Sequence, residues 1–457
     1  MPSKVNQNPL KRINKRRLLQ TPRGMKDILP EDYLYYDYLI EIAKKTLEFY
    51  NFRRCEPPVL EKAELYNKGI GSKTDIVEKE MYTLRTKEEG EFLALRPEYT
   101  AGIVRAYVEN GMFNWPQPIK LYSFGPIFRH EKPQAGRYRQ FYQLNIESIG
   151  DSSPALDAEI ILASRAFLEN LGFNQSDLEI RINSIGCNKC RSLYIRALVR
   201  YYKQHLKDIC KDCRKRLKNN PLRVLDCKNS KCIVTKAKAP SLLDYLCGDC
   251  KDHFKNVLDI LDNVGVSYVL DKTLVRGLDY YSRTVFEIRK KDKDPFRFAQ
   301  ENLVSRSARN KETSLSLAGG GRYDYLVKLL GGLDRPAVGV AFGVERLVEE
   351  MKAMRRNLEF PKPKVFLIQI GDAAKKQAFI LLEKLRKANI STEANLEKDN
   401  INSQIKNADR VNAPYALILG QQEVLDGMII LKDMASGLQE TIPFDRTIEE
   451  LKKRLKN

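Results

Sequence analysis

The chain has 457 residues, 43% of them hydrophobic and 30% charged, which is enough for two or three globular domains with sizeable cores. Its apolar runs fall short of the ~18 residues that a membrane-spanning helix needs, so no such helix is expected. The net charge of +20, from 79 basic and 59 acidic residues, indicates an acidic partner, of which nucleic acid is the commonest.

Nine cysteines in a chain of this length, without a hydrophobic signal segment, do not indicate a secreted disulfide framework. We therefore expect a reduced, cytoplasmic setting. The first 20 residues form a basic arm: residues 1–26 hold eight Lys or Arg and no acidic residue. Such an arm could contact RNA or be a transit peptide, which is also poor in acidic residues.

The segment FLALRPEYTAGIVRAY predicts a strand that breaks at Arg96 and Pro97 and continues as a helix from about Ala101. Glu98 lies at this corner, where it could enter a pocket or only complement the helix dipole. Farther along, Tyr122–Gly150 predicts two antiparallel strands joined by a long basic loop. Guanidinium groups there would suit a polyphosphate, although a charge run alone favours a hairpin that faces solvent.

Residues 187–255 differ in character, with 18 Lys or Arg against 6 Asp or Glu and eight of the nine cysteines. We interpret them as a small helical insertion whose basic surface is a candidate RNA contact. Three CxxC pairs and one CxxxxC pair could form two tetrahedral zinc sites. The alternatives are reduced thiols or an ancestral metal site without its metal. The candidate ligands are Cys187, Cys190, Cys210, Cys213, Cys227, Cys232, Cys247 and Cys250.

The second half of the chain contains three further motifs. LVRGLDYY lies between two strand-like runs, and a basic segment from Arg289 to Lys311, predicted to be a loop, separates it from AGGGRYDYLVKLL. AVGVAFGVERLVEEM predicts a strand that runs into a helix carrying Arg346. From Lys364 onward, short buried-type strands alternate with helices, which predicts a compact α/β domain.

Five of these motifs, in this order, resemble those of the histidyl-tRNA synthetases of the bacterial type, which are class II aminoacyl-tRNA synthetases. Pro58 matches the proline of the first class motif, FRHE and RQFYQ match the second, and GVAFGVER matches the third. LVRGLDYY and GGGRYD match the two histidine-specific signatures. The resemblance extends from Thr21 to the C-terminus.

The resemblance implies an α+β fold: a class II antiparallel-sheet catalytic domain flanked by helices, a helical insertion domain and a C-terminal α/β anticodon-binding domain. It also implies a homodimer with the first motif at its interface. The expected boundaries are 1–20 for the arm, 21–186 and 256–360 for the catalytic domain, 187–255 for the insertion and 364–457 for the anticodon-binding domain.

The implied reaction is the ATP-dependent ligation of L-histidine to histidine tRNA through a histidyl adenylate, with release of AMP and diphosphate and with Mg²⁺ accompanying ATP. Such chemistry needs positioning and charge neutralisation more than a strong protein base. By the family pattern, Arg129 contacts the α-phosphate, Arg346 binds the γ-phosphate and Arg276 stabilises the pentavalent phosphorus. The implied ATP-binding residues are Arg129, Glu131, Arg137, Phe141, Gln143, Arg276 and Arg346.

A polar pocket suits the imidazole of histidine, because buried donors left unpaired reject other amino acids. The implied histidine-binding residues are Glu98, Tyr99, Thr100, Arg129, Gln143, Glu147, Arg276, Tyr280, Tyr281 and Tyr323. Gln134 is expected to face the extra 5′ guanosine of histidine tRNA. Taken singly, Phe141 could be a core residue and Glu147 could face solvent.

Three features depart from the family pattern: Lys132 where many relatives carry arginine, the basic arm, and a longer loop at residues 289–311. The alternative function is that of a non-catalytic relative, either a regulatory subunit of histidine biosynthesis or a sensor of uncharged tRNA. The intact arginines and the complete C-terminal region disfavour it. A generic RNA-binding protein would leave the pocket signatures unexplained.

Overall fold

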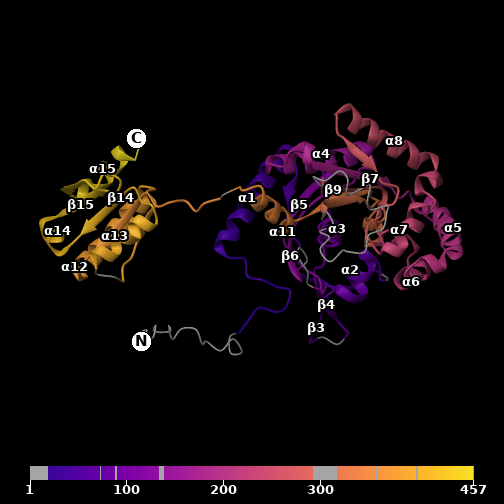
Figure 1. Cartoon of the computed structure of the whole chain (residues 1–457), viewed down its shortest axis with the longest axis horizontal. Helices are drawn as coiled ribbons and strands as arrows, with labels where there is room; N and C mark the ends of the chain where they lie inside the picture. The colour runs from indigo at the N-terminus through magenta and orange to yellow at the C-terminus, as the bar shows by residue number, and fades with distance from the viewer. Residues whose placement is uncertain are drawn as a thin grey trace, which may run out of the picture. The chain divides into compact units, whose positions relative to one another are not determined.

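The protein, for which we describe a computed structural model, divides into two compact units, Met1–Leu358 and Glu359–Asn457 (Figure 1). Each unit has its own core. Among the residues described, no helix combines the length and apolarity needed to cross a bilayer. The structure describes residues 19–72, 74–87, 90–132, 138–291, 316–356, 358–397 and 400–455.

The first unit is built on an eight-stranded sheet in the order β1-β5-β6-β11-β10-β9-β7-β8. Its six central strands are antiparallel, and only the edge pairs β1–β5 and β7–β8 are parallel. The predicted hairpin is confirmed, because β5 and β6 pair from Ile119–Ile149 to Phe128–Gln140. The strands are β1 (Arg53–Arg54), β5 (Ile119–Phe128), β6 (Gln140–Ile149), β7 (Leu178–Ser184), β8 (Tyr268–Leu270), β9 (Ser282–Lys290), β10 (Ser316–Arg322) and β11 (Ala337–Gly343).

One face of this sheet packs against α1 (Pro30–Phe49), α4 (Pro154–Asn170) and α11 (Val344–Ala353). Because side chains alternate along a strand, Leu144 and Ile146 of β6 enter this core, while the odd-numbered residues from 141 to 147 face the other side. One face is therefore apolar and covered by helices, and the opposite face is free to carry polar groups.

The predicted chain break beside Pro97 is also observed. Strand β4 (Phe92–Leu95) ends there, and α3 (Thr100–Glu109) begins five residues later. Strand β4 lies between β2 (Leu60–Lys62) and β3 (Thr83–Arg85) in a small antiparallel sheet. The α+β fold class that the sequence predicts is confirmed.

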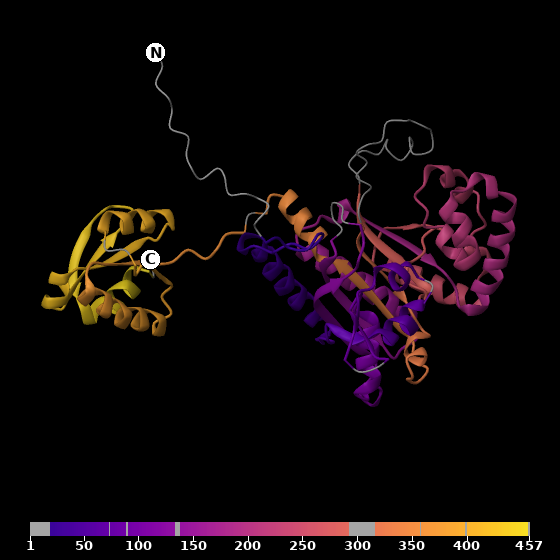
Figure 2. The same cartoon turned by 90° about the horizontal axis from the view of Figure 1, so that it is seen from below.

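The cysteine-rich segment between β7 and β8 is helical. Its helices are α5 (Asn188–Gln204), α6 (Lys211–Asn219), α7 (Ser230–Ala237) and α8 (Gly248–Asn263). They gather at one end of the first unit (Figure 2). Because β7 and β8 pair in parallel at the sheet edge, these helices form the crossover that returns the chain from the end of β7 to the start of β8.

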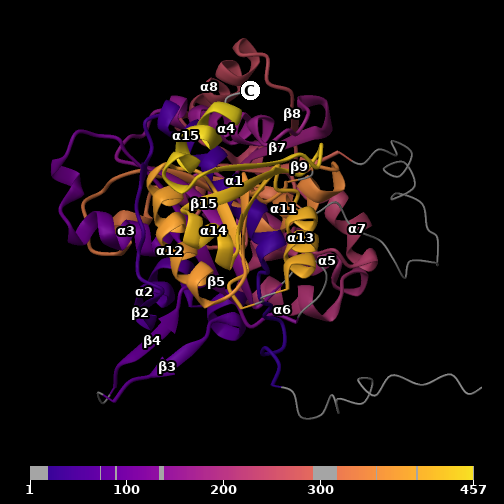
Figure 3. The ribbon, with the colours of Figure 1, turned by 90° about the vertical axis from the view of Figure 1, so that its left-hand side faces the viewer.

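The second unit is a five-stranded mixed sheet in the order β13-β12-β14-β15-β16, with α12 and α13 on opposite sides (Figure 3). Alternate residues of β12 separate two cores, because Val365 packs with α12 and Phe366 packs with α13. The elements are β12 (Val365–Gln369), α12 (Asp372–Lys387), β13 (Thr392–Ala394), α13 (Ile401–Arg410), β14 (Tyr415–Leu419), α14 (Gln421–Asp426), β15 (Met428–Asp433), β16 (Gln439–Pro443) and α15 (Thr447–Arg454).

Candidate active site

A cavity of about 620 Å³ lies over the polar face of the large sheet, a volume typical of small-molecule sites. It brings together side chains from α3, β6, β9, β10, α11 and the loop before β9. The predicted site residues that line it are Glu98, Thr100, Arg129, Glu131, Phe141, Gln143, Glu147, Arg276, Tyr280, Tyr281, Tyr323 and Arg346.

Glu147 is a carboxylate held inside the protein by hydroxyl donors. It is 1% exposed, and it accepts hydrogen bonds from Tyr323 Oη at 2.6 Å and Thr100 Oγ1 at 2.7 Å. Burial raises the pKa of Glu147 to about 7, although these hydrogen bonds act in the opposite direction. A Cβ at Gly339 of the facing strand β11 would lie 1.6 Å from Glu147 Oε2, so only glycine leaves room for this carboxylate.

Glu98 combines the two roles that the sequence left open. Its carboxylate accepts hydrogen bonds from the backbone N–H of Thr100 at 2.7 Å and of Ala101 at 2.9 Å, at the start of α3. It also lines the cavity and accepts a hydrogen bond from Tyr280 Oη at 3.5 Å. Burial raises its pKa, and the two backbone donors limit the rise.

Arg276 is a partly buried cation of the cavity wall. Its Nη1 lies 3.2 Å from Glu287 Oε1, and Arg289 contacts the other oxygen of the same carboxylate. Burial alone would raise the pKa of Glu287, but the charges of the two arginines outweigh it and lower the pKa. A Cβ at Gly319 would lie 2.2 Å from Arg276 Nη1, so a glycine of the GGGRYD motif leaves space for this guanidinium.

Two further arginines lie where β5 ends and α11 begins. Arg129 donates from Nε to the carbonyl of Pro97 at 2.8 Å, and its guanidinium lies 5.5 Å from the ring centre of Phe141. Arg346 donates to the carbonyl of Ser316 at 2.6 Å. These backbone contacts orient both side chains along the cavity wall.

Three predicted site residues are not placed in the cavity. Tyr99 is buried elsewhere, and its hydroxyl donates to Glu56 Oε1 at 2.9 Å. Gln134 and Arg137 lie outside the described residues, as do most of the arm and the loop at 292–311.

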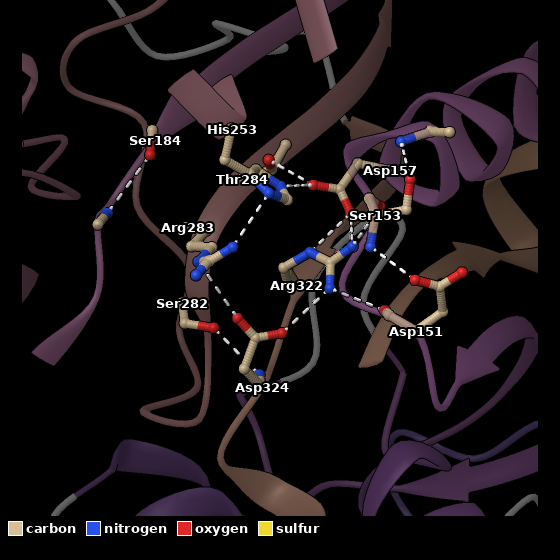
Figure 4. A network of polar contacts seen from close by, with 12 residues as sticks. Asp151, Ser153, Asp157, Ser184, His253, Ser282, Arg283, Thr284, Arg322 and Asp324 are labelled. Carbon is tan, nitrogen blue, oxygen red and sulfur yellow. Dashed lines mark hydrogen bonds and ion pairs between the residues drawn. The ribbon is translucent and has the colours of Figure 1, made fainter. Parts of the chain in front are cut away.

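A buried charge network fixes the end of β10, directly before Tyr323 (Figure 4). Asp157 of α4 accepts from His253 Nε2 at 2.6 Å and from Arg322 Nε at 2.8 Å, and Arg322 also contacts Asp324. Burial would raise the pKa of Asp157, but the positive charge of Arg322 and the contact with His253 lower it. The network joins α4, β10 and α8, and it orients Tyr323 toward Glu147.

Sequence reasoning missed several residues of the cavity wall. Glu287 alternates with core residues along β9, a pattern that could have found it. Arg223 comes from the insertion and donates to the carbonyl of Gly277 at 2.9 Å, a contact that no sequence spacing indicates.

Within the described residues, Gln143 Oε1, Asn145 Oδ1 and Arg276 Nε are buried without hydrogen-bond partners, which is typical of groups that receive a ligand.

The fold defines the class of protein. Doubly wound nucleotide-binding domains are built on parallel strands, whereas this cavity lies on a sheet whose six central strands are antiparallel. An antiparallel sheet of this kind, with Arg129 of the second class motif and Arg346 of the third beside the cavity, is the catalytic architecture of class II aminoacyl-tRNA synthetases.

Comparison with known proteins identifies the family. The family model for histidyl-tRNA synthetase matches residues 24–347, and that for the anticodon binding domain matches residues 364–454. The histidine–tRNA ligase of Halothermothrix orenii is 42% identical over 438 residues, covering 95% of this chain and 99% of the relative. That of Dehalococcoides mccartyi is 42% identical over 441 residues, covering 96% and 100%. The apo structure of Staphylococcus aureus histidyl-tRNA synthetase is 32% identical with a TM-score of 0.75, covering 95% and 100%. The chain belongs to the histidyl-tRNA synthetase family.

Proposed function

We propose that this chain condenses L-histidine with ATP and transfers the histidyl group to histidine tRNA. The observation that carries the proposal is the juxtaposition, in one cavity, of a buried polar pocket around Glu147 and a row of arginines. A histidine imidazole is both a donor and an acceptor, so it suits a pocket of carboxylate and phenol groups. The arginines suit the phosphates of the Mg²⁺–ATP complex.

In this proposal an oxygen of the histidine carboxylate attacks the α-phosphorus, and diphosphate leaves. Arg129 contacts the α-phosphate, Arg346 the γ-phosphate, and Arg276 stabilises the charge that develops on the pentavalent phosphorus. Phe141 stacks on adenine, which Glu131 binds by hydrogen bonding. A ribose hydroxyl at the tRNA 3′ end then attacks the histidyl carbonyl, and AMP leaves.

Within the pocket, Glu98, Thr100 and Gln143 hold the α-ammonium group. Glu147 and Tyr323 bind the imidazole, with Tyr280 and Tyr281 beside it. Glu147 is suited to this role because a carboxyl group whose pKa is about 7 can accept a hydrogen bond from an imidazole N–H when ionised and donate one to an imidazole nitrogen when protonated. The non-catalytic alternative is not favoured, because relatives named as ligases match at about 40% identity over nearly the whole chain.

The second unit would read the anticodon, as its family implies, and Gln134 would face the extra 5′ guanosine. A direct test is charging of a histidine tRNA transcript with radioactive histidine. We expect charging that depends on ATP and falls when the 5′ guanosine or the anticodon is changed. A folded protein that charges none of these transcripts would contradict the proposal.

A homodimer is the assembly that we propose. Large apolar side chains are exposed around the small sheet, including Val59 and Leu60 beside Pro58 of the first motif, and Leu84 and Phe92 on the neighbouring strands. Such a surface suits self-association. Light scattering coupled to size exclusion should give twice the chain mass of 52.7 kDa. Because none of the nine cysteines forms a disulfide, a reduced cytoplasmic setting fits the protein.

A further inference from the structure

The insertion brings its cysteines together in two groups of four, and it joins pairs that are far apart in the sequence. In each group the four sulfur atoms lie within 4.8 Å of one another. We call them the first and second cysteine clusters. The first cluster contains Cys187, Cys190, Cys247 and Cys250. The second cluster contains Cys210, Cys213, Cys227 and Cys232.

The sulfur separations match a tetrahedral metal centre. Four sulfurs ~2.3 Å from one zinc ion form a tetrahedron with edges of about 3.8 Å. Sγ–Sγ distances are 3.6 Å for Cys187–Cys190, 3.9 Å for Cys210–Cys227 and 3.8 Å for Cys213–Cys232. None of the described cysteines is in a disulfide. These Sγ–Sγ separations are thus too long for S–S bonds, and they match the separations of four thiolates that bind one metal ion.

The backbone around the clusters favours thiolates. Cys187, Cys210 and Cys247 each immediately precede a helix, so their sulfurs lie at the positive end of the helix dipole. Backbone N–H groups also donate to the sulfurs, from Cys247 to Cys190 Sγ at 3.1 Å and from Cys210 to Cys232 Sγ at 3.2 Å. Donors of this kind orient the ligands of a metal site.

We propose that each cluster binds one structural Zn²⁺. Each thiol loses its proton to solvent on binding, so four thiolates and one Zn²⁺ leave a net charge of −2. The insertion offsets this charge, because residues 187–255 hold 18 basic and 6 acidic side chains. A closed set of four thiolates leaves no open position for substrate, so these ions hold the fold together and take no part in the reaction.

The insertion has a structural need for such cross-links. Its helices α6 and α7 have only 9 and 8 residues, a length at which isolated helices are marginal in water. The first cluster ties the start of α5 to the start of α8, and the second ties α6 to α7. Metal coordination would therefore supply much of the folding free energy of this segment.

The clusters also hold the loop that carries Arg276. Between Cys213 and Cys227 of the second cluster, Asn220 donates to Asp279 Oδ1 at 2.7 Å. Arg223, in the same segment, donates to the Gly277 carbonyl. Both contacts hold the loop between Arg276 and Tyr281.

The first cluster supports the other end of that loop. Arg191, next to Cys190, donates to the carbonyl of Tyr281 at 2.9 Å. Insertion residues and the pocket tyrosines also share one hydrophobic cluster. We infer that Asn220, Arg223 and Arg191 are positioning residues, through which metal binding sets the geometry of the histidine pocket. This second part rests on the proposed function, whereas the metal assignment does not.

Metal content tests the assignment. Full-length protein purified without chelators should contain two zinc ions per chain by mass spectrometry, and its Co²⁺-substituted form should show the absorption of tetrahedral thiolate coordination. Cys190→Ser with Cys250→Ser, and Cys213→Ser with Cys232→Ser, should each lose one ion, whereas the control Cys55→Ser keeps both. A folded wild type that takes up no added zinc, holds iron instead, or keeps two ions in both double variants would overturn the proposal.

Kinetics of histidine-dependent ATP–diphosphate exchange test the coupling. Asn220→Ala with Arg223→Ala should raise KM for histidine about tenfold, as loss of a buried hydrogen bond does, and leave KM for ATP within about twofold. Arg223→Lys, which keeps one donor, should restore part of the loss. An unchanged KM for histidine in a zinc-loaded variant would overturn the coupling. Absence of exchange in the wild type would instead contradict the proposed function and leave the zinc result standing.

Discussion

The catalytic unit, Met1–Leu358, and the C-terminal unit, Glu359–Asn457, both place helices on β-sheets, but they bury different kinds of polar group. The catalytic unit buries charged side chains, including Glu98, Glu147, Asp157 and Arg322. In the C-terminal unit, the buried polar side chains of the described residues are Gln369, Gln404 and Thr447, all uncharged. A buried charge is costly unless it is paired, and Asp157 and Arg322 pair with each other. Glu98 and Glu147 instead line the cavity, so they mark the sheet face that must recognise a polar substrate.

The largest effect is expected at the cavity cation. Arg276→Ala should lower kcat/KM for histidine-dependent exchange by about 10³-fold, because a fixed charge at the developing phosphorane is lost. Arg289→Ala is the matched control, since it removes the other guanidinium bound to Glu287. We expect the control to lose less than about tenfold. Equal losses in the two variants would assign the effect to Glu287 rather than to Arg276.

The next effect concerns stability. Asp157→Asn should lower the unfolding free energy of the catalytic unit by about 3–5 kcal/mol, because Arg322 keeps its buried charge without the main partner. Asp151→Asn is the control, since the Asp151 side chain accepts a local hydrogen bond from the Ser153 N–H. The contact of Asp151 with Arg322 is made by its backbone carbonyl, which the substitution keeps. Urea unfolding measures both, and a change below about 1 kcal/mol in Asp157→Asn would show that the network is dispensable.

Glu147 should make stability depend on pH. Its pKa is raised from 4.5 in the unfolded chain to about 7 in the folded protein, so the folded state binds the proton more tightly. Wild-type stability should therefore fall as pH rises from about 4.5 to 7, by ~3 kcal/mol in total. Glu147→Gln removes this loss. The urea midpoint of the wild type should therefore fall between pH 5 and pH 8 by more than that of the variant, and parallel profiles would contradict the assigned pKa.

A smaller effect is expected in the C-terminal unit. Gln404 donates to the backbone carbonyl of Gln369 at 2.7 Å inside the core. Gln404→Leu should cost about 1–3 kcal/mol in the unfolding of this unit, because buried polar groups of β12 lose their partner. Histidine activation should not change. Lys453→Ala, which removes two surface ion pairs with Glu449 and Glu450, should leave the unfolding midpoint nearly unchanged. Loss of exchange activity in Gln404→Leu would contradict the expectation that this buried uncharged pair serves only the stability of the C-terminal unit.

Local patterns in the sequence predicted what local physics decides. The β5–β6 hairpin, the strand break beside Pro97 and the start of α3 follow from periodicity and proline chemistry, and all are observed. The family resemblance identified most of the residues that line the cavity, and the fold brings them together there. Their individual roles stay predictions. Tyr99 lies next to two cavity residues in the sequence, yet the turn into α3 directs it to Glu56.

Contacts between distant segments could not be predicted in this way. The link between Asp157 and Arg322 joins residues 165 positions apart, and the pairing of Cys190 with Cys250 depends on how α5 and α8 meet. Spacing identified the cysteine pairs but not their partners. The contact of Arg223 with the Gly277 carbonyl likewise depends on the packing of the insertion, which no local pattern encodes.

The most direct measurement is ATP–diphosphate exchange by the purified wild type with each of the twenty amino acids in turn. The cavity predicts exchange with histidine alone, because only an imidazole satisfies the buried groups around Glu147. Exchange with a different amino acid, or none by a folded, zinc-loaded protein, would contradict the assignment of this cavity to histidine activation.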